Sequence, residues 1–371
     1  MTLVQENTAA FQAQPPASVL PVTAGNGRRI ANLSFVCAVL IACIHVPNPD
    51  CISTFFTRWF PGGLVALGVP FFFVVSGYLF LNHLDRLHWW RDALAKRLRT
   101  VLVPFLLINL VWFAVYYGVH NIAVARFGSH QPDCMRLTWR NFFFSVNPLP
   151  NFRVMEPALG PTWYLKALLL LALCAPLYLW FIRRSRLCAA AFLAAVAAAW
   201  YAYAAWMFAS PPVGEFPCYE LEPRCLFYFA AGMSLRLWPL PRLSIPAALA
   251  SATVGFVLLV LCALRIPPSP MHRSLLSSLA VPFLLAALWT ATPSSPWPRW
   301  LVANTFPLYI LHFMLFYLAP AVCKALHLPA APATAFGQAL CVLAVVPVSC
   351  LLAAAFKKAV PRTASLFFGG R

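Results

Sequence analysis

Ten apolar segments, each long enough to cross a lipid bilayer, follow one another along this chain of 371 residues. A transmembrane helix needs about 20 mostly apolar residues, and about 17 suffice at the lower limit. Charged or proline-rich breaks separate the segments, which lie at approximately residues 30–46, 62–81, 99–119, 161–182, 187–208, 220–238, 244–264, 274–293, 301–322 and 334–356. The sequence therefore predicts an all-α fold, a polytopic integral membrane bundle of about ten transmembrane helices.

The composition of the chain excludes an ordinary soluble fold. Hydrophobic residues make up 62% of the chain and charged residues 10%, with a mean hydropathy of +0.76, whereas soluble domains have about 45–50% apolar and about 25% charged residues. A net charge of +18 would point to a nucleic-acid partner in a soluble protein. In a membrane protein, the excess of cationic residues in cytoplasmic loops explains most of this charge. We therefore expect the lipid bilayer, and no nucleic acid, as a partner.

The distribution of basic residues between alternate loops predicts the orientation. If the amino terminus is cytoplasmic, 17 of the 27 Lys and Arg residues fall on the inner side, 9 fall on the outer side, and Lys166 lies within the fourth segment. Cytoplasmic loops of membrane proteins carry an excess of Lys and Arg. We therefore expect both termini in the cytoplasm and a multi-pass protein of the cell inner (plasma) membrane.

The segments outside the predicted bundle are short. Residues 1–27 are rich in Ala, Gln, Pro and Thr and are followed by Arg28 and Arg29, an order that does not fit a cleavable signal peptide. They are expected to form a disordered cytoplasmic tail. Residues 28–360 are expected to form the transmembrane domain, and residues 361–371 a cytoplasmic C-terminal tail.

Acidic and cysteine residues narrow the possible chemistry. All nine Asp and Glu residues lie in predicted tails, loops or helix ends, which argues against a carboxylate-based proton relay or cation transporter. The 12 Cys residues form no CxxC pair and have no spacing suited to zinc, so they are interpreted as packing residues. We expect no disulfide, no metal and no bound cofactor.

Two histidines lie in apolar segments that contain no carboxylate in their cores. His45 ends the first segment, and His312 lies near the middle of the ninth. Ionisable groups at such depth are functional candidates by default. An imidazole titrates near neutral pH, so a neutral ring can take a proton from a hydroxyl that attacks a thioester, and later return it. The alternative for each is a structural histidine that is hydrogen-bonded to a neighbouring helix.

Four stretches of the sequence, taken in order, resemble the membrane-bound acyltransferase family 3. The family's opening helix, closed by a histidine, is similar to ANLSFVCAVLIACIHV at residues 31–46. Its most recognisable segment, an apolar run that ends in Ser-Gly-Tyr, is similar to GVPFFFVVSGYLF at residues 68–80. Its basic stretch before a Pro-containing helix resembles WRDALAKRLRTVLVPF at residues 90–105. Its Trp-aromatic-Leu and Tyr-x-x-His helices resemble PTWYLKALLLL and FPLYILHFMLF at residues 161–171 and 306–316.

The resemblance implies a ten-helix enzyme with a specific catalytic residue. Such an enzyme takes an acyl group from a cytosolic acyl-CoA, usually acetyl-CoA, and places it on a hydroxyl of a glycan at the other membrane face. His45 matches the family's catalytic histidine. Family members carry an arginine eleven positions earlier, which at helical geometry lies on nearly the same face about 16.5 Å away. This chain has Ser34 there, which leaves three readings open: compensation from another helix, a different donor, or lost activity.

The basic motif supplies candidates for binding the donor. Lys96, Arg97 and Arg99 lie on the predicted cytoplasmic side, where the phosphates of acyl-CoA would arrive. Arginine forks bind phosphate groups well. The alternative is that these residues only set the topology through their positive charge.

Further residues of the matching stretches are possible acceptor-binding or site-lining groups. Ser76 is not in a GxSxG elbow, so we interpret it as a packing or hydrogen-bonding group; it precedes Gly77, which permits close helix approach, and Tyr78. Trp163 and Tyr164 begin the fourth segment at its outer end, where they either line the acceptor entrance or anchor the helix at the interface. His312 completes this group of candidates.

The sequence thus favours a membrane O-acyltransferase, most simply an O-acetyltransferase of a cell-surface or secreted glycan, with His45 as general base. One alternative is a transporter or exporter of an acylated or anionic small molecule, which the basic inner face favours. A second is a catalytically inactive relative that acts as an assembly partner. Neither the acceptor, nor the acyl chain length, nor the oligomeric state follows from the sequence.

Overall fold

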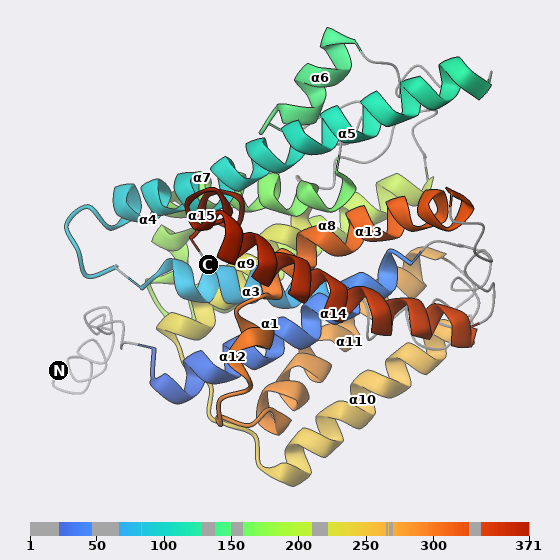
Figure 1. The fold of residues 1–371 in the computed structure, drawn as a ribbon. Helices are drawn as coiled ribbons and strands as arrows, with labels where there is room; N and C mark the ends of the chain where they lie inside the picture. Colours follow the sequence, from blue (N-terminus) through green and yellow to red (C-terminus); the bar gives the residue numbers. More distant parts are fainter. Residues whose placement is uncertain are drawn as a thin grey trace, which may run out of the picture.

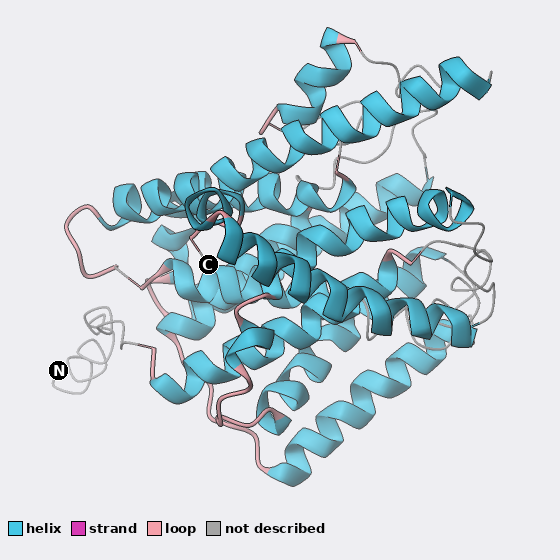
Figure 2. Cartoon of the chain, viewed as in Figure 1, coloured by secondary structure: helices cyan, strands magenta, loops and turns pink. Residues whose placement is uncertain are grey.

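The computed structural model describes residues 22–46, 67–82, 84–127, 138–149, 159–209, 222–264, 266, 270–325 and 335–370. Within these residues the regular structure is helical, and no strand is present among them (Figure 2). The helices in chain order are α1 (Ala24–Ile44), α3 (Gly68–Phe80), α4 (Trp89–Arg97), the π-helix η3 (Leu98–Leu102), α5 (Val103–Phe127), α6 (Trp139–Val146), the 3-10 turn η5 (Gly160–Thr162), α7 (Trp163–Ile182), α8 (Arg186–Ala209), α9 (Pro223–Leu237), α10 (Ile245–Ala263), α11 (Pro270–Ala291), α12 (Arg299–Val302), α13 (Thr305–Ala325), α14 (Ala335–Ala359) and α15 (Pro361–Phe367).

Each of the ten predicted apolar segments contains a helix. In the described part of the chain, six helices are long and apolar enough to cross a membrane by length and composition: Ala24–Ile44, Trp89–Val115, Gly160–Ile182, Arg186–Trp206, Ile245–Ala263 and Ala339–Ala359. Three further apolar helices are shorter, namely Gly68–Phe80, Leu275–Ala291 and Thr305–Leu318. The sixth segment contains α9, a helix of 15 residues that carries Arg236. The prediction of an all-helical fold is confirmed for these residues.

The boundaries of the two tails differ from those expected. Helix α1 begins at Ala24, inside the predicted tail 1–27, because the Thr23 side chain caps it by accepting from the Asn26 N–H at 3.2 Å. Residues 1–21 lie outside the described residues. The predicted tail 361–371 contains α15, which folds back so that Phe367 packs against α14.

Burial separates an inner set of helices from a peripheral set. The apolar window of Gly160–Ile182, which contains α7, is 56% buried, whereas that of α10 is 6% buried. Large apolar side chains, among them Leu249, Phe256 and Val257, are exposed along α10. Soluble monomers rarely expose so continuous an apolar face, whereas such a face is typical of a helix that contacts lipid. Helix α1 passes through the middle of the bundle, with α3 and α13 packed against it (Figure 1).

Two glycines allow α3 and α9 to cross at very short range. A Cβ atom built on Gly77 would lie 1.9 Å from the Phe229 carbonyl oxygen, and one on Gly232 would lie 1.9 Å from the Val74 carbonyl oxygen. No other residue type fits at either position without moving a backbone. The predicted role of Gly77 in close helix approach is therefore seen in the structure. Because Gly77 is fixed in this way, Ser76 and Tyr78 on either side of it have fixed directions.

Two polar side chains tie the first half of α1 to the segment after α11. Asn32 is 1% exposed, and its amide donates to the carbonyls of Pro293 and Ser295 at 3.2 and 3.0 Å. Arg29 Nε donates to the Thr292 carbonyl at 2.9 Å. Buried polar groups persist where they are hydrogen-bonded. These bonds set the rotation of α1 and hence the face that Ser34 presents.

Candidate active site

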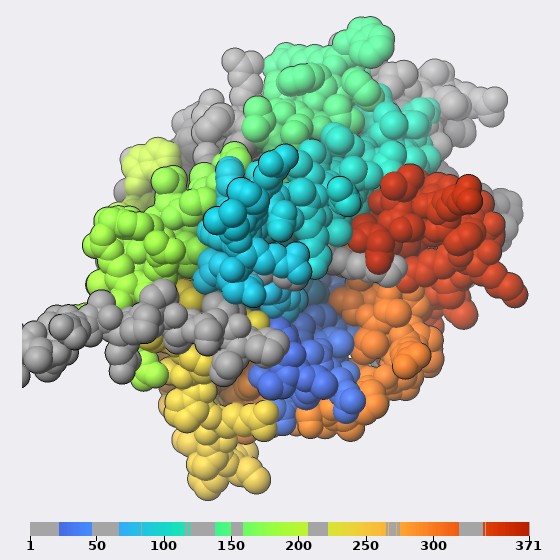
Figure 3. Space-filling model, turned by 90° about the vertical axis from the view of Figure 1, so that its left-hand side faces the viewer, coloured from blue at the N-terminus to red at the C-terminus, as the bar shows by residue number. Residues whose placement is uncertain are grey.

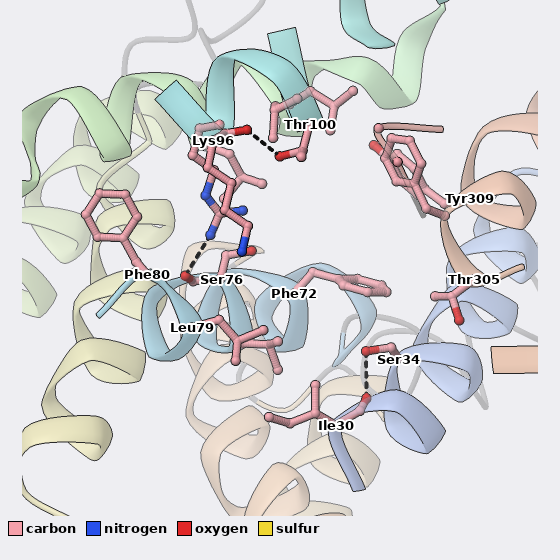
Figure 4. A pocket seen from close by; sticks show the side chains of 18 of the residues that line it. Ile30, Ser34, Phe72, Ser76, Leu79, Phe80, Lys96, Thr100, Thr305 and Tyr309 are labelled. Atoms are coloured by element: carbon pink, nitrogen blue, oxygen red, sulfur yellow. Dashed lines mark hydrogen bonds between the residues drawn. The ribbon is translucent and has the colours of Figure 1, made fainter. Parts of the chain in front are cut away.

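A cavity of about 600 Å³ lies between α1, α3, the α4–η3 junction, α7, α13 and the C-terminal end of the chain. Figure 3 shows the face of the molecule on which α4, the start of α1 and residues near 300 come together, and Figure 4 shows the cavity itself. Its polar lining residues are Ser34, Ser76, Asn82, Lys96, Arg97, Thr100, Tyr164, Thr305 and Tyr309. Apolar side chains make up most of the remaining wall. Its size and its few placed polar groups are typical of small-molecule sites.

The basic motif contributes two of its three cations to this cavity. Lys96 and Arg97 line it, and Arg97 Nη2 donates to the Ser76 carbonyl at 3.1 Å. Arg99 is exposed and does not line the cavity. The spacing of the motif explains the difference, because two residues on a helix are turned by about 200° at 3.6 residues per turn. The three residues therefore do not line the cavity as one group.

Pro104 accounts for the π-helix η3, which follows this motif. Pro104 has no N–H to donate to the carbonyl of Thr100, four residues earlier, so the regular ladder is interrupted and η3 forms there. The widened turn meets the end of the chain: a Cβ on Gly369, whose φ is +64°, would lie 2.6 Å from the Thr100 carbonyl oxygen. Gly369 and Gly370 both line the cavity. The C-terminal segment is thus part of the cavity wall.

Arg236 on α9 lies just behind the cavity and was not among the predicted site residues. It is 7% exposed, its Cζ lies 4.9 Å from the centroid of the Tyr78 ring, and its Nη1 lies 3.3 Å from Tyr78 Oη. Its Nη2 donates to Asn82 Oδ1 at 3.4 Å. Because arginine has only donors, it holds the Asn82 oxygen and leaves the amide N–H groups for the cavity. The default functional reading of an arginine in an apolar segment would have identified it.

The Ser-Gly-Tyr motif is a hydrogen-bonding element. Ser76 Oγ lies 3.2 Å from Tyr164 Oη, within hydrogen-bond distance, and Tyr164 packs edge-on against Phe73 at 4.7 Å between ring centroids. Among the described residues, no imidazole is hydrogen-bonded to Ser76. Trp163 does not line the cavity and packs against Phe73 at 6.3 Å.

Ser34 lines the cavity, at the position where members of the family that this chain resembles carry an arginine. Its hydroxyl donates to the carbonyl of Ile30 on its own helix at 2.7 Å. In Figure 4, Ser34 and Ile30 lie on one side of the cavity, and Lys96 and Thr100 lie on the other. The cavity wall at Ser34 therefore carries a short hydroxyl that is hydrogen-bonded to its own helix. The guanidinium of an arginine at this position would instead reach into the cavity.

His45 and His312, which are far apart in the sequence, are neighbours in the structure. Their ring centroids are 5.4 Å apart, and the Phe313 ring lies edge-on to His45 at 5.3 Å. Nδ1 of His312 lies 3.0 Å from the Leu308 carbonyl oxygen, and Nε2 of His312 is buried without a hydrogen-bond partner. Neither imidazole lines the cavity. The two predicted histidines form one paired site at the far end of α1 from Ser34.

Tyr309 connects the cavity to the histidine pair. It lines the cavity, its hydroxyl donates to the Pro161 carbonyl, and its ring centroid lies 6.0 Å from that of Tyr164. On the next turn of α13, the ring of His312 lies 6.3 Å from that of Tyr309. A molecule in the cavity is therefore separated from the imidazoles by one tyrosine layer.

Comparison with known proteins agrees with these motifs. The chain matches the family described as acyltransferase domain over residues 31–354. A relative, the succinoglycan biosynthesis protein ExoH of Rhizobium meliloti (strain 1021), is 32% identical over 151 residues, a stretch that covers 37% of this chain and 38% of the relative. No solved structure gives a significant match. Because the family match covers most of its length, the chain belongs to the membrane-bound acyltransferase family 3 that its motifs predict.

Proposed function

We propose that this chain is a multi-pass inner-membrane O-acyltransferase that moves an acyl group, most simply acetyl, from cytosolic acyl-CoA to a hydroxyl of a cell-surface or secreted glycan. The observation that carries the proposal is the arrangement along α1. A cation-bearing cavity lies beside the first half of this helix, at Ile30 and Ser34, and the imidazole pair of His45 and the buried His312 lies at its C-terminal end. The name of the relative refers to the biosynthesis of succinoglycan, which supports a glycan as the acceptor.

The proposed topology has ten membrane-spanning helices and both termini in the cytoplasm. Its support is the excess of Lys and Arg in the loops assigned to the inner side. The cavity lies at the same end of the bundle, because Lys96, Arg97 and the C-terminal Gly370 all line it. On the proposed topology, the cavity lies on the side from which a water-soluble, anionic donor would arrive.

Lys96 and Arg97 are proposed to bind the phosphates of acyl-CoA, with the amide of Asn82 as a neutral donor beside them. Charge-assisted hydrogen bonds from guanidinium to phosphate are stronger than neutral ones. The exposed Arg99 is proposed to add only long-range attraction, which salt screens. The acyl-thioester end of the donor then extends past Tyr309 toward the imidazoles.

His45 is proposed to act as the general base. It takes the proton of the acceptor hydroxyl while the hydroxyl oxygen attacks the thioester carbonyl carbon, and the new C–O ester bond forms. The C–S bond then breaks, its electron pair leaves with sulfur, and the proton on His45 passes to the thiolate. The products are the acylated acceptor and CoA as a thiol, so no oxidant, metal or further reactant is needed.

The experiment that tests this function uses the protein in nanodiscs with labelled acetyl-CoA and a glycan acceptor. The expected result is transfer of label to the glycan by the native chain, and its loss in His45→Ala while donor binding remains. His272→Ala, which changes an exposed histidine on α11, is the matched control and should be fully active. Full transfer by folded His45→Ala would refute the mechanism.

Ser34 favours a second candidate, a catalytically inactive relative that acts as an assembly partner. Its short hydroxyl bonds to its own helix and leaves the cavity wall without the cation that family members carry there. Equilibrium binding of labelled acetyl-CoA separates the two functions. Absence of both binding and hydrolysis would favour the inactive relative, whereas binding without acyl chemistry would favour the transporter that the basic face also allows.

A further inference from the structure

The distal nitrogen of His312 is a buried hydrogen-bond acceptor that awaits a donor. Nδ1 lies 3.0 Å from the carbonyl oxygen of Leu308, a group that can only accept. The ring proton therefore sits on Nδ1, and Nε2 carries a lone pair. His312 is 0% exposed, and Nε2 has no partner. An unsatisfied buried polar atom in a native protein requires an explanation.

Among the described rings that contact His312, the ring of His45 is the one able to offer a ring N–H to Nε2. The Phe316 ring stands edge-on to His312 at 6.2 Å and offers no N–H or O–H. Tyr309 is closer to the cavity, and its hydroxyl already donates to the Pro161 carbonyl. His45 lies across the α1–α13 contact with a ring separation of 5.4 Å. Because Nδ1 is bonded back to α13, the distal nitrogen is the one turned away from its own helix.

We infer that His312 is a positioning residue for His45, an inference that rests on the proposed function. Nε2 of His312 accepts the N–H of the His45 ring, directly or through one water. The other nitrogen of His45 is then the unprotonated one and faces the acceptor hydroxyl. When His45 takes the hydroxyl proton and becomes an imidazolium, the same contact stabilises it. The proton remains on His45 until it passes to the leaving thiolate, and His312 stays neutral throughout.

The apolar setting explains why an imidazole holds this place. Orienting groups for catalytic histidines are commonly carboxylates, but a buried carboxylate in an apolar helix bundle costs far more than a neutral acceptor. Described neighbours of the pair are aromatic rings and helix backbone. A second imidazole supplies an acceptor without adding charge.

The test compares four variants of the full-length protein in nanodiscs. His312→Leu keeps the bulk and removes the acceptor. His312→Gln places an amide oxygen near the former Nε2, whereas His312→Asn is too short to do so. Phe316→Leu removes a ring beside His312 but leaves both imidazoles. Donor dissociation constants and turnover at saturating acetyl-CoA are measured for each, and donor binding also reports that a variant is folded.

The expected result is a split between turnover and binding. His312→Leu and His312→Asn should lose about tenfold to a hundredfold in turnover, which reaches only the lower limit of the range of about 10² to 10⁴ assigned to positioned proton transfer, with unchanged donor binding. His312→Gln should recover most of that loss, and Phe316→Leu should remain near native turnover. Equal turnover in His312→Gln and His312→Asn, or in His312→Leu and Phe316→Leu, would overturn the inference.

The double variant separates this inference from the proposed function. If His312 acts through His45, adding His312→Leu to His45→Ala should change the residual rate by less than twofold, because the two substitutions remove one interaction. A further tenfold fall would show that His312 acts independently. If His45→Ala is fully active, the proposed mechanism itself fails; if it is inactive while His312→Leu is normal, only the present inference fails.

Discussion

The first half of helix α1 and its C-terminal end are surrounded by different chemistry. At Ser34, α1 faces a cavity that Lys96 and Arg97 also line, and Figure 4 shows Lys96 on the opposite side. At the His45 end, the described neighbours are the rings of His312 and Phe313. The first environment carries cations that an anionic ligand can contact, whereas aromatic rings line the second among the described residues. Under the proposed function, a charged donor is therefore recognised in one place and its proton transfer takes place in another.

The largest effect is expected from His45→Gln, because it keeps a hydrogen-bonding side chain but removes proton exchange. Turnover should fall by about 10² to 10⁴, and the donor dissociation constant should stay within about twofold because the cavity is untouched. Steady-state kinetics combined with equilibrium binding of labelled acetyl-CoA measures both quantities. Weakened donor binding of the same size as the loss of turnover would mean that donor binding at the cavity and proton transfer at His45 are not separate.

At the cavity, the double variant Lys96→Gln and Arg97→Gln is expected to weaken donor binding and to leave turnover unchanged. Contacts to phosphates far from the thioester act as uniform binding, so the KM for the donor should rise while turnover at saturation is retained. A rise of about ten- to a hundredfold corresponds to about 1.4 to 2.8 kcal/mol. The difference from the native chain should shrink at high salt.

Arg99→Gln is the matched control for that double variant, because it removes a charge two residues from Arg97 at an exposed position outside the cavity. Its KM should change by less than about threefold, as expected for a screened surface charge. Equal effects of Arg99→Gln and Arg97→Gln would reduce the motif to a topology signal. The cavity would then no longer differ from the His45 region as a site of donor binding.

Local patterns in the sequence predicted the parts of this comparison that depend on helix geometry. Apolar windows of membrane-spanning length gave the helices, and the requirement for close approach gave Gly77, whose Cβ would collide with α9. Depth in an apolar segment selected His45 and His312 as separate candidates. Their proximity could not be predicted, because it depends on the packing of α1 against α13, and nothing in the period of either helix encodes its partner.

The cavity itself was predicted only in part, for the same reason. Lys96 and Arg97 were found through their motif, and Arg99 was grouped with them because a motif ignores the turn of the helix between its members. Asn82 and Arg236 were not predicted. Asn82 follows the matching stretch at residues 68–80, and Arg236 lies inside the apolar segment 220–238. Their joint effect depends on a hydrogen bond between α9 and the end of α3, which no linear pattern contains.

Arg236→Gln should have a smaller effect than the loss of Lys96 and Arg97, because its guanidinium acts on the cavity through Asn82 and through its charge. Donor affinity should fall by about five- to tenfold, which corresponds to about 1 to 1.4 kcal/mol. Arg236→Lys keeps the charge and loses the fork that holds Tyr78 and Asn82 together, so it should lie between Gln and native. If both variants bind the donor as the native chain does, Arg236 only packs against Tyr78.

The smallest effect, and the sharpest test of the cavity end, is expected from Ser34→Arg. In Figure 4 the labelled side chains around Ser34 include those of Ile30, Phe72 and Thr305, and Lys96 lies on the opposite side of the cavity. The new side chain would therefore enter the cavity from the wall opposite Lys96. Two unit charges 4 Å apart in water interact by about 1 kcal/mol, which corresponds to roughly fivefold in affinity. Donor affinity should therefore rise by about two- to fivefold, more at low salt than at high salt, and turnover at saturation should stay the same because His45 is on the far end of the helix. Ser34→Gln adds length without charge and should leave affinity unchanged. A fall in affinity specific to Ser34→Arg would show that the cations already present reach across the cavity and repel a further charge, and that Lys96 and Arg97 have taken over the function of the arginine that this chain lacks.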